Sequence, residues 1–155
     1  MQLAEALSLR ADAARRIEQL RSRITSNARI QEGEEPSENA AALLAEARRV
    51  FDELVVLIGR INKTNTVVRV GSGSMTDALA QRDVLRMRHK MLTDAADAAS
   101  GRDSVYARQM RSELAYVSLL PVANIRSEAD SVSEELRELD VQIQRMNWTS
   151  ELSEA

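Results

Sequence analysis

The side chains best suited to binding chemistry gather at three places, each near the start or the end of an expected long helix. They are polar or charged residues together with the only tryptophan: Asn62, Lys63, Asn65, Arg82, Asp83, Asn147 and Trp148. We predict that they line one small ligand site at one end of a helical bundle. A structural role stays open beside this prediction, because Asn, Thr and Arg side chains also satisfy the unpaired carbonyl groups at helix ends. Trp148 would then anchor the tail or contact a second subunit.

Metal and acid–base chemistry find little support in the residues. The only histidine, His89, lies in a basic stretch that also contains Arg88 and Lys90. A histidine metal site needs nearby carboxylates and usually a second histidine, and the Glu-x-x-His spacing of di-iron bundles does not occur. The chain has no cysteine, so thiolate sites are excluded. No phosphate-binding glycine loop or nucleophile elbow is found. We therefore predict no catalytic residue, no metal and no cofactor, and a protein that is not an enzyme.

Charge argues against nucleic acid as a partner. The formal net charge is −3 and aromatic residues make up 3% of the chain, whereas nucleic-acid binders are basic and stack bases on aromatic rings. The basic cluster at 82–90, with Arg108 and Arg111, could bind phosphate or an acidic partner. We favour the alternative that these arginines pair with the acidic faces of other helices.

The composition predicts a mainly α protein. Apolar residues make up 44% of the chain, while Gly and Pro number only 5 and 2, so few turns interrupt the elements. Periodicity gives the expected elements: helices over about 2–31, 40–64, 77–99 and 122–146, and β pieces over about 66–70 and 114–120. We expect a single domain, 1–155, forming an elongated four-helix bundle with a small β-hairpin or antiparallel sheet at one end.

Capping residues set the expected helix boundaries. Asn39 or Ser37 is suited to start the second helix and Thr76 the third, because their side-chain oxygens accept from unpaired backbone N–H groups. Gly33 and Gly101 are suited to end the first and third helices, since glycine adopts the left-handed conformation found after many helix ends.

The last long stretch carries a strict heptad pattern. From Val122 to Met146, apolar residues recur at alternating steps of three and four, which is typical of a helix that buries one narrow seam. We predict that part of this seam is a self-association surface made by Ile125, Val132, Leu136, Leu139 and Ile143. A homo-oligomer is therefore expected.

Five short motifs occur in an order that resembles a known family. They are Glu32-Gly-Glu-Glu-Pro36, Arg60-Ile-Asn-Lys-Thr-Asn65, Thr76-Asp-Ala-Leu79, Arg82-Asp-Val-Leu85 and Asn147-Trp-Thr149. The chain resembles an uncharacterised septicolysin-like family of short bacterial proteins, common in actinobacteria. The resemblance implies a helical fold and, through its label, a cytolytic activity, but it supplies no catalytic residues. The chain departs from the family at the Gly71-Ser-Gly-Ser74 turn and at Leu120-Pro121, which puts only the local turn geometry in question.

These observations lead to three hypotheses of function. The first is a non-enzymatic, self-associating helical bundle with a structural or interaction role. The second is a membrane-active, septicolysin-like cytolysin, for which the only expected hairpin is short and carries Arg69. The third is a small-ligand binder at the sheet end of the bundle. The longest apolar run, Leu54–Ile58, is too short to span a bilayer, so we expect a cytoplasmic protein that meets membranes only under the second hypothesis.

Overall fold

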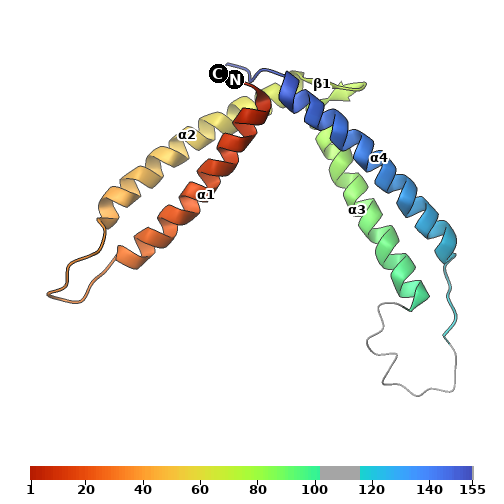
Figure 1. Ribbon diagram of the computed structural model, residues 1–155, viewed down its shortest axis with the longest axis horizontal. Helices are drawn as coiled ribbons and strands as arrows, with labels where there is room; N and C mark the ends of the chain where they lie inside the picture. The colour runs from red at the N-terminus through yellow and green to blue at the C-terminus, as the bar shows by residue number, and fades with distance from the viewer. Residues whose placement is uncertain (102–115, 155) are drawn as a thin grey trace. The chain divides into compact units, whose positions relative to one another are not determined.

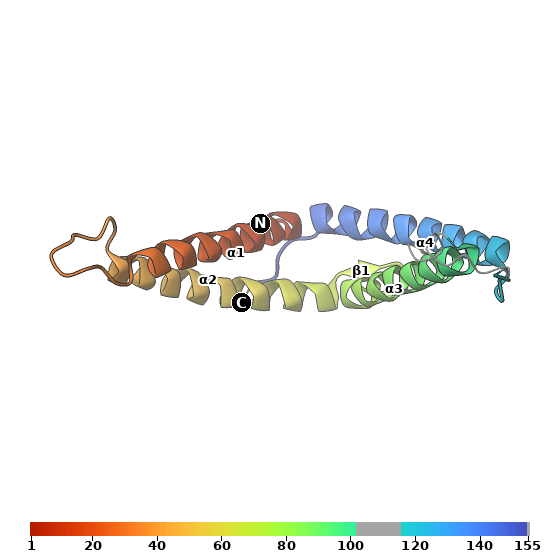
Figure 2. The same cartoon turned by 90° about the horizontal axis from the view of Figure 1, so that it is seen from below.

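Four long helices and one very small sheet make up the part of the protein that the structure describes. The computed structural model describes residues 1–101 and 116–154. Within them lie, in chain order, α1 (Leu3–Asn27), α2 (Ala40–Val67), β1 (Arg69–Val70), β2 (Gly73–Ser74), α3 (Met75–Ser100) and α4 (Val122–Thr149). The prediction of a mainly α fold with four helices and a small antiparallel sheet is confirmed. The helices α1 and α2 run side by side, as do α3 and α4 (Figures 1 and 2).

The start of α2 follows the predicted capping chemistry. The Asn39 side chain accepts a hydrogen bond from the backbone N–H of Ala42 at 3.0 Å, so Asn39 and not Ser37 is the N-cap. The end of α1 was predicted too late. The helix stops at Asn27, whose side-chain oxygen accepts hydrogen bonds from the Ser37 hydroxyl and the Glu38 N–H. Gly33 has a positive φ of 92°, but it lies in a turn beyond the helix end.

The third helix begins at Met75, two residues before the predicted start at residue 77. Ser74, not Thr76, is the N-cap, and its hydroxyl accepts from the Asp77 N–H while the Asp77 carboxylate accepts from the Ser74 N–H. This reciprocal capping box satisfies two of the unpaired donors at the helix start. Gly101 closes α3 in the left-handed conformation, with φ 76°, as predicted.

The two predicted β segments were wrong in extent. Residues 66 and 67 belong to α2, because the Val68 N–H still donates to the Thr64 carbonyl at 3.0 Å, as in a helix. The Thr66 hydroxyl also donates to the Lys63 carbonyl at this helix end. The strand that follows is two residues long and pairs with Gly73–Ser74. In the predicted strand 114–120, residues 116–120 form no strand, and residues 114 and 115 lie outside the described residues.

The chain divides into two compact units. The first contains Met1–Arg69 together with the C-terminal residues from Gln144, and the second contains Val70–Ile143. The boundary falls within β1, and α4 contributes to both units.

In the first unit, α1 and α2 share a small apolar core. Leu20 packs with Leu43 and Ala47, and Ile24 and Val50 cover the edge of this cluster. Arginines of α1 reach glutamates beside the core: Arg16 donates from Nε to the Glu46 carboxylate at 2.9 Å, and Arg23 pairs with Glu38. The hydrogen bond from Arg23 lowers the pKa of Glu38 below its ordinary value, and the same contact raises the pKa of Arg23.

The C-terminal segment is tied into the same unit by backbone hydrogen bonds. Gln2 and Glu151 form an antiparallel bridge, with the Leu3 N–H donating to the Ser150 carbonyl and the Leu152 N–H donating to the Met1 carbonyl, both at 2.9 Å. On the other side, the Ser153 N–H donates to the Thr64 hydroxyl at 2.9 Å. Because Thr64 and Leu152 are both buried, the segment closes one end of the helix pair.

In the second unit, α3 and α4 are joined by polar contacts along their length. Arg88 pairs with Glu128 at 2.6 Å, Arg126 with Asp97 at 3.0 Å and Arg86 with Asp140 at 3.7 Å. The preferred alternative, that arginines of the basic cluster pair with acidic helix faces, is thus confirmed for Arg86 and Arg88. Arg108 and Arg111 lie outside the described residues.

The core of the first unit yields a stability prediction. Leu20→Ala removes a fully buried side chain and leaves a cavity, so we expect the free energy of unfolding to fall by about 2–5 kcal/mol. Leu9→Ala, on the same helix but about half exposed, is the matched control and is expected to cost less than about 1 kcal/mol. Urea unfolding followed by circular dichroism measures both, and equal losses would contradict the described core.

Candidate functional site

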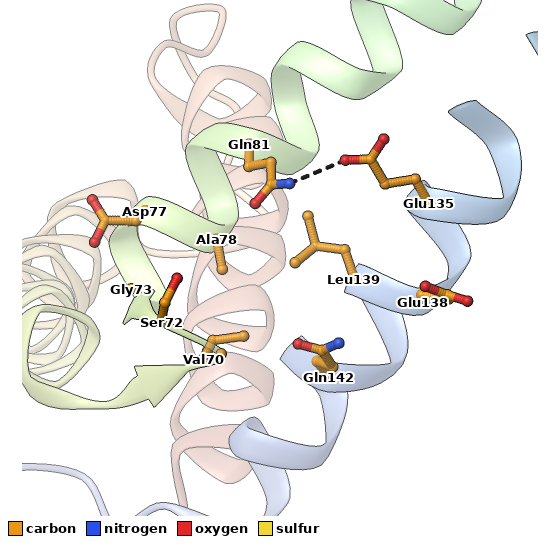
Figure 3. Close-up of a pocket in the computed structure, with 11 residues that line it drawn as sticks. Val70, Ser72, Gly73, Asp77, Ala78, Gln81, Glu135, Glu138, Leu139 and Gln142 are labelled. Atoms are coloured by element: carbon orange, nitrogen blue, oxygen red, sulfur yellow. Dashed lines mark hydrogen bonds between the residues drawn. The ribbon is translucent and has the colours of Figure 1, made fainter. Parts of the chain in front are cut away.

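A cavity beside the β-hairpin is the candidate site. It has a volume of about 290 Å³ and lies entirely within the second unit, between the hairpin, the first turns of α3 and the acidic face of α4 (Figure 3). Val70, Ala78 and Leu139 are buried side chains in its wall. The remaining lining residues are polar or glycine: Gly71, Ser72, Gly73, Asp77, Gln81, Glu135, Glu138 and Gln142.

The hairpin can form one wall of this cavity because its residues allow a tight turn that leads directly into α3. Gly71 adopts a positive φ of 59°, which glycine reaches without steric cost. Gly73 precedes the N-cap Ser74, and a Cβ atom placed on it would lie 3.1 Å from the Asp77 Cβ. The small residue therefore leaves room for the carboxylate that caps α3.

The rim of the cavity is acidic and rich in amide groups. Gln81 of α3 donates from its amide nitrogen to the Glu135 carboxylate of α4 at 3.2 Å (Figure 3). Glu138 and Gln142 lie one and two turns further along α4. Carboxylate and amide oxygens above an apolar wall suit a small molecule with an amine or other donor group.

The residues predicted as one ligand site are divided between the two units. Five of them belong to the first unit: Asn62, Lys63, Asn65, Asn147 and Trp148. Lys63 donates from Nζ to the Glu154 carbonyl at 3.2 Å and so helps to hold the C-terminal segment. Asn147 is buried, whereas Trp148 is 65% exposed. A shared ligand site for these residues stays a prediction.

Arg82 and Asp83 belong to the second unit. The Arg82 side chain is largely buried, and its Nη2 lies 3.5 Å from the Asp83 Oδ1 atom. Arg82 and Asp83 do not line the hairpin cavity, and neither do the five residues of the first unit.

Sequence reasoning missed the residues that do form the cavity, although two signals pointed to them. The first is the Gly-Ser-Gly-Ser turn, which marks a place where the backbone turns sharply into a helix. The second is the run of carboxylates and amides on one side of α4, at Glu135, Glu138 and Gln142. Without the pairing of α3 with α4, nothing in the sequence places these side chains beside that turn.

The structure also shows the surroundings of the only histidine, which was considered as a metal ligand. His89 is half-buried on α3, and its carbonyl accepts from the Thr93 hydroxyl. Among the described residues, no group of three or more His, Asp or Glu side chains is arranged to hold a metal ion.

The predicted self-association seam lies on the inner side of α4. Val132, Leu139 and Ile143 are buried within the chain, and Ile125 and Leu136 are half-buried. Their heptad spacing is thus used at least partly inside one chain.

The fold and cavity define a mainly α protein built on pairs of antiparallel helices, with a polar cavity at a short hairpin. A family model matches residues 10–152, and the chain belongs to this family of unknown function, DUF6847. The chain is also similar to a functionally unknown conserved protein from Corynebacterium diphtheriae, with 38% identity, a TM-score of 0.92 and 99% of each chain covered. No curated protein matches it.

The similar protein comes from an actinobacterium, which agrees with the predicted resemblance to a bacterial family. The comparisons give no support to the septicolysin label. In the part of the chain that the structure describes, no helix has the length and apolar character needed to cross a membrane.

Two glycines, one in the hairpin and one inside α2, are expected to respond in opposite ways to alanine. Gly73→Ala crowds the Asp77 carboxylate and weakens the cap of α3, so we expect a loss of about 1 kcal/mol. Gly59→Ala, inside α2 with open space around its Cβ position, is expected to gain about 0.5–1 kcal/mol. Thermal unfolding of both variants checks the geometry, and a stabilised Gly73→Ala would contradict it.

Proposed function

We propose that this protein is a non-enzymatic helical protein that acts by associating with further copies of itself. The observation that carries the proposal is the apolar surface that each unit leaves exposed on its long helices. Isolated exposed apolar residues are ordinary on protein surfaces, but apolar residues in helical register typically mark an interface.

The first exposed row lies on α2. Leu44, Phe51 and Val55 are spaced by seven and four residues, so they lie along one line of the helix. They are 41%, 53% and 66% exposed, while Leu43 and Ala47 of the same helix are buried in the core of the first unit. We call these three residues the α2 stripe.

The second exposed row lies on α3. Val84, Met87 and Met91 are spaced by three and four residues and are 57%, 64% and 63% exposed. The buried residues Leu85 and Leu92 face the other way on the helix. We call Val84, Met87 and Met91 the α3 stripe, and methionine suits such a surface because its flexible side chain adapts to a partner.

Burial against a second copy would give these stripes the partners that the described residues do not provide. Removing apolar surface from water contributes about 25 cal/mol per Å², and a symmetric dimer buries the same patch twice. This supports self-association by the exposed surfaces on α2 and α3.

The two other hypotheses have weaker support. A ligand site is favoured by the cavity beside the hairpin, but the Glu135 carboxylate already accepts from Gln81, and the Asp77 carboxylate already accepts from the Ser74 N–H. The membrane-active hypothesis relied on an apolar hairpin, yet each strand is two residues long and β1 contains the exposed Arg69. Both rank below self-association.

Charged substitutions in the stripes test the proposal. We expect Val55→Glu and Met91→Glu to lower the average mass in sedimentation velocity toward that of one chain, because each places a carboxylate in an apolar contact. Ala42→Glu adds the same charge at an exposed position of α2 outside the stripe and is expected to leave the mass unchanged. Circular dichroism confirms that each variant keeps its helices. If both stripe variants sediment like the parent chain, the stripes are not interfaces.

A further inference from the structure

The α2 stripe exposes the only phenylalanine of the chain. Phe51 is 53% exposed in a sequence with one Phe, one Trp and two Tyr. Aromatic side chains are enriched in the central parts of protein interfaces, where they contribute much of the binding energy. Placing the single Phe on the surface beside two aliphatic residues therefore marks this part of α2 as the centre of a contact.

We infer that the α2 stripe binds the same stripe of a second copy in antiparallel orientation, about a two-fold axis that passes between Arg49 and Val50. This inference rests on the proposed self-association and names the surface and the geometry that produce it. The occupant of the stripe is thus a second copy of this chain, in a symmetric contact where each copy uses the same residues.

The spacing of the residues is self-complementary in that orientation. Leu44, Arg48, Phe51 and Val55 follow one another at steps of four, three and four, which read the same in both directions along the helix. Antiparallel pairing therefore places Leu44 opposite the partner's Val55, and Arg48 opposite the partner's Phe51. Such alternating steps are those of two helices that pack along a narrow seam.

The charges are self-complementary as well. Arg48 and Asp52 are both exposed, and within residues 1–101 and 116–154 neither has an ion-pair partner. In the antiparallel contact, Arg48 lies one residue from the partner's Asp52, and the two-fold axis creates this contact twice. A parallel contact would instead bring like charges together.

The α3 stripe lacks this pattern. Arg88, which lies closest to its line, already pairs with Glu128 of α4, and Lys90 pairs with Asp94. The charged side chains beside the α3 stripe therefore form ion pairs within the chain. Those beside the α2 stripe can pair with side chains of opposite charge on a second copy.

Exchanging the two charges tests both the surface and its orientation. We expect Arg48→Asp alone, or Asp52→Arg alone, to weaken the dimer by about tenfold, because each turns two attractive contacts into two repulsive ones. The double variant Arg48→Asp with Asp52→Arg restores the opposite charges in reversed order. We expect its dissociation constant to return to within about threefold of the parent value, measured by sedimentation equilibrium.

A matched control uses the same spacing on the far side of the helix. Arg49→Asp and Glu53→Arg alter an exposed pair, also four residues apart, whose direction at 100° per residue lies away from the stripe. These variants carry the same cost of like charges within one helix and are expected to leave the dissociation constant unchanged.

The outcomes separate this inference from the proposed function. If the parent chain is a dimer but the double variant does not recover, or the control variants weaken it equally, the antiparallel α2 contact is wrong and self-association stands on another surface. If the parent chain is a monomer, both fail. The contact is supported if the single variants raise the dissociation constant, the double variant restores it and the control variants leave it unchanged.

Discussion

The structure depends on how much apolar surface a pair of helices removes from water. A single helix is marginal in isolation, and each pair here buries a narrow line of side chains. In the first unit that line is built from Leu20, Leu43 and Ala47, and the small alanine limits the area that it provides. Hydrogen bonds at the helix ends add to the stability that the core provides, as in the bond from the Ser153 N–H to the Thr64 hydroxyl. A two-helix layer of this kind leaves its outer faces exposed, and their composition then determines what the protein binds.

The helices could be predicted because their apolar residues recur with helical period over many turns. The roles of Asn39 and Gly101 were also predictable, since asparagine commonly caps the start of a helix and glycine commonly ends one in the left-handed conformation. The helix ends that were predicted wrongly are those where neighbouring residues favour different local structures. Thr66 is β-branched and looked like part of a strand, but its hydroxyl bonds the Lys63 carbonyl and the helix continues. Ser74 and Thr76 are both good caps, and the reciprocal bond with Asp77 decides between them.

The candidate site was harder to predict, because its residues come from different elements whose pairing the sequence does not state. Glu135, Glu138 and Gln142 read as an ordinary solvated helix face until α3 and the hairpin lie against it. Lys63 read as a ligand-binding residue, yet it donates to the Glu154 carbonyl. The heptad on α4 predicts a buried seam, and Val132, Leu139 and Ile143 are buried, but periodicity alone does not distinguish a partner helix in the same chain from one in another chain. The exposed face of α2 was likewise not predicted, since a broad apolar pattern does not show which of its residues a partner helix covers.

The central claim is that these exposed stripes join copies of the chain. The most direct measurement is the solution mass of the unaltered protein by light scattering, taken across a wide range of protein concentration. The account predicts an average mass that rises with protein concentration above the 17.2 kDa of one chain, toward the mass of a dimer, and that falls back on dilution. A constant mass of 17.2 kDa at every concentration would contradict it, and would mean that the stripes do not join copies of the chain.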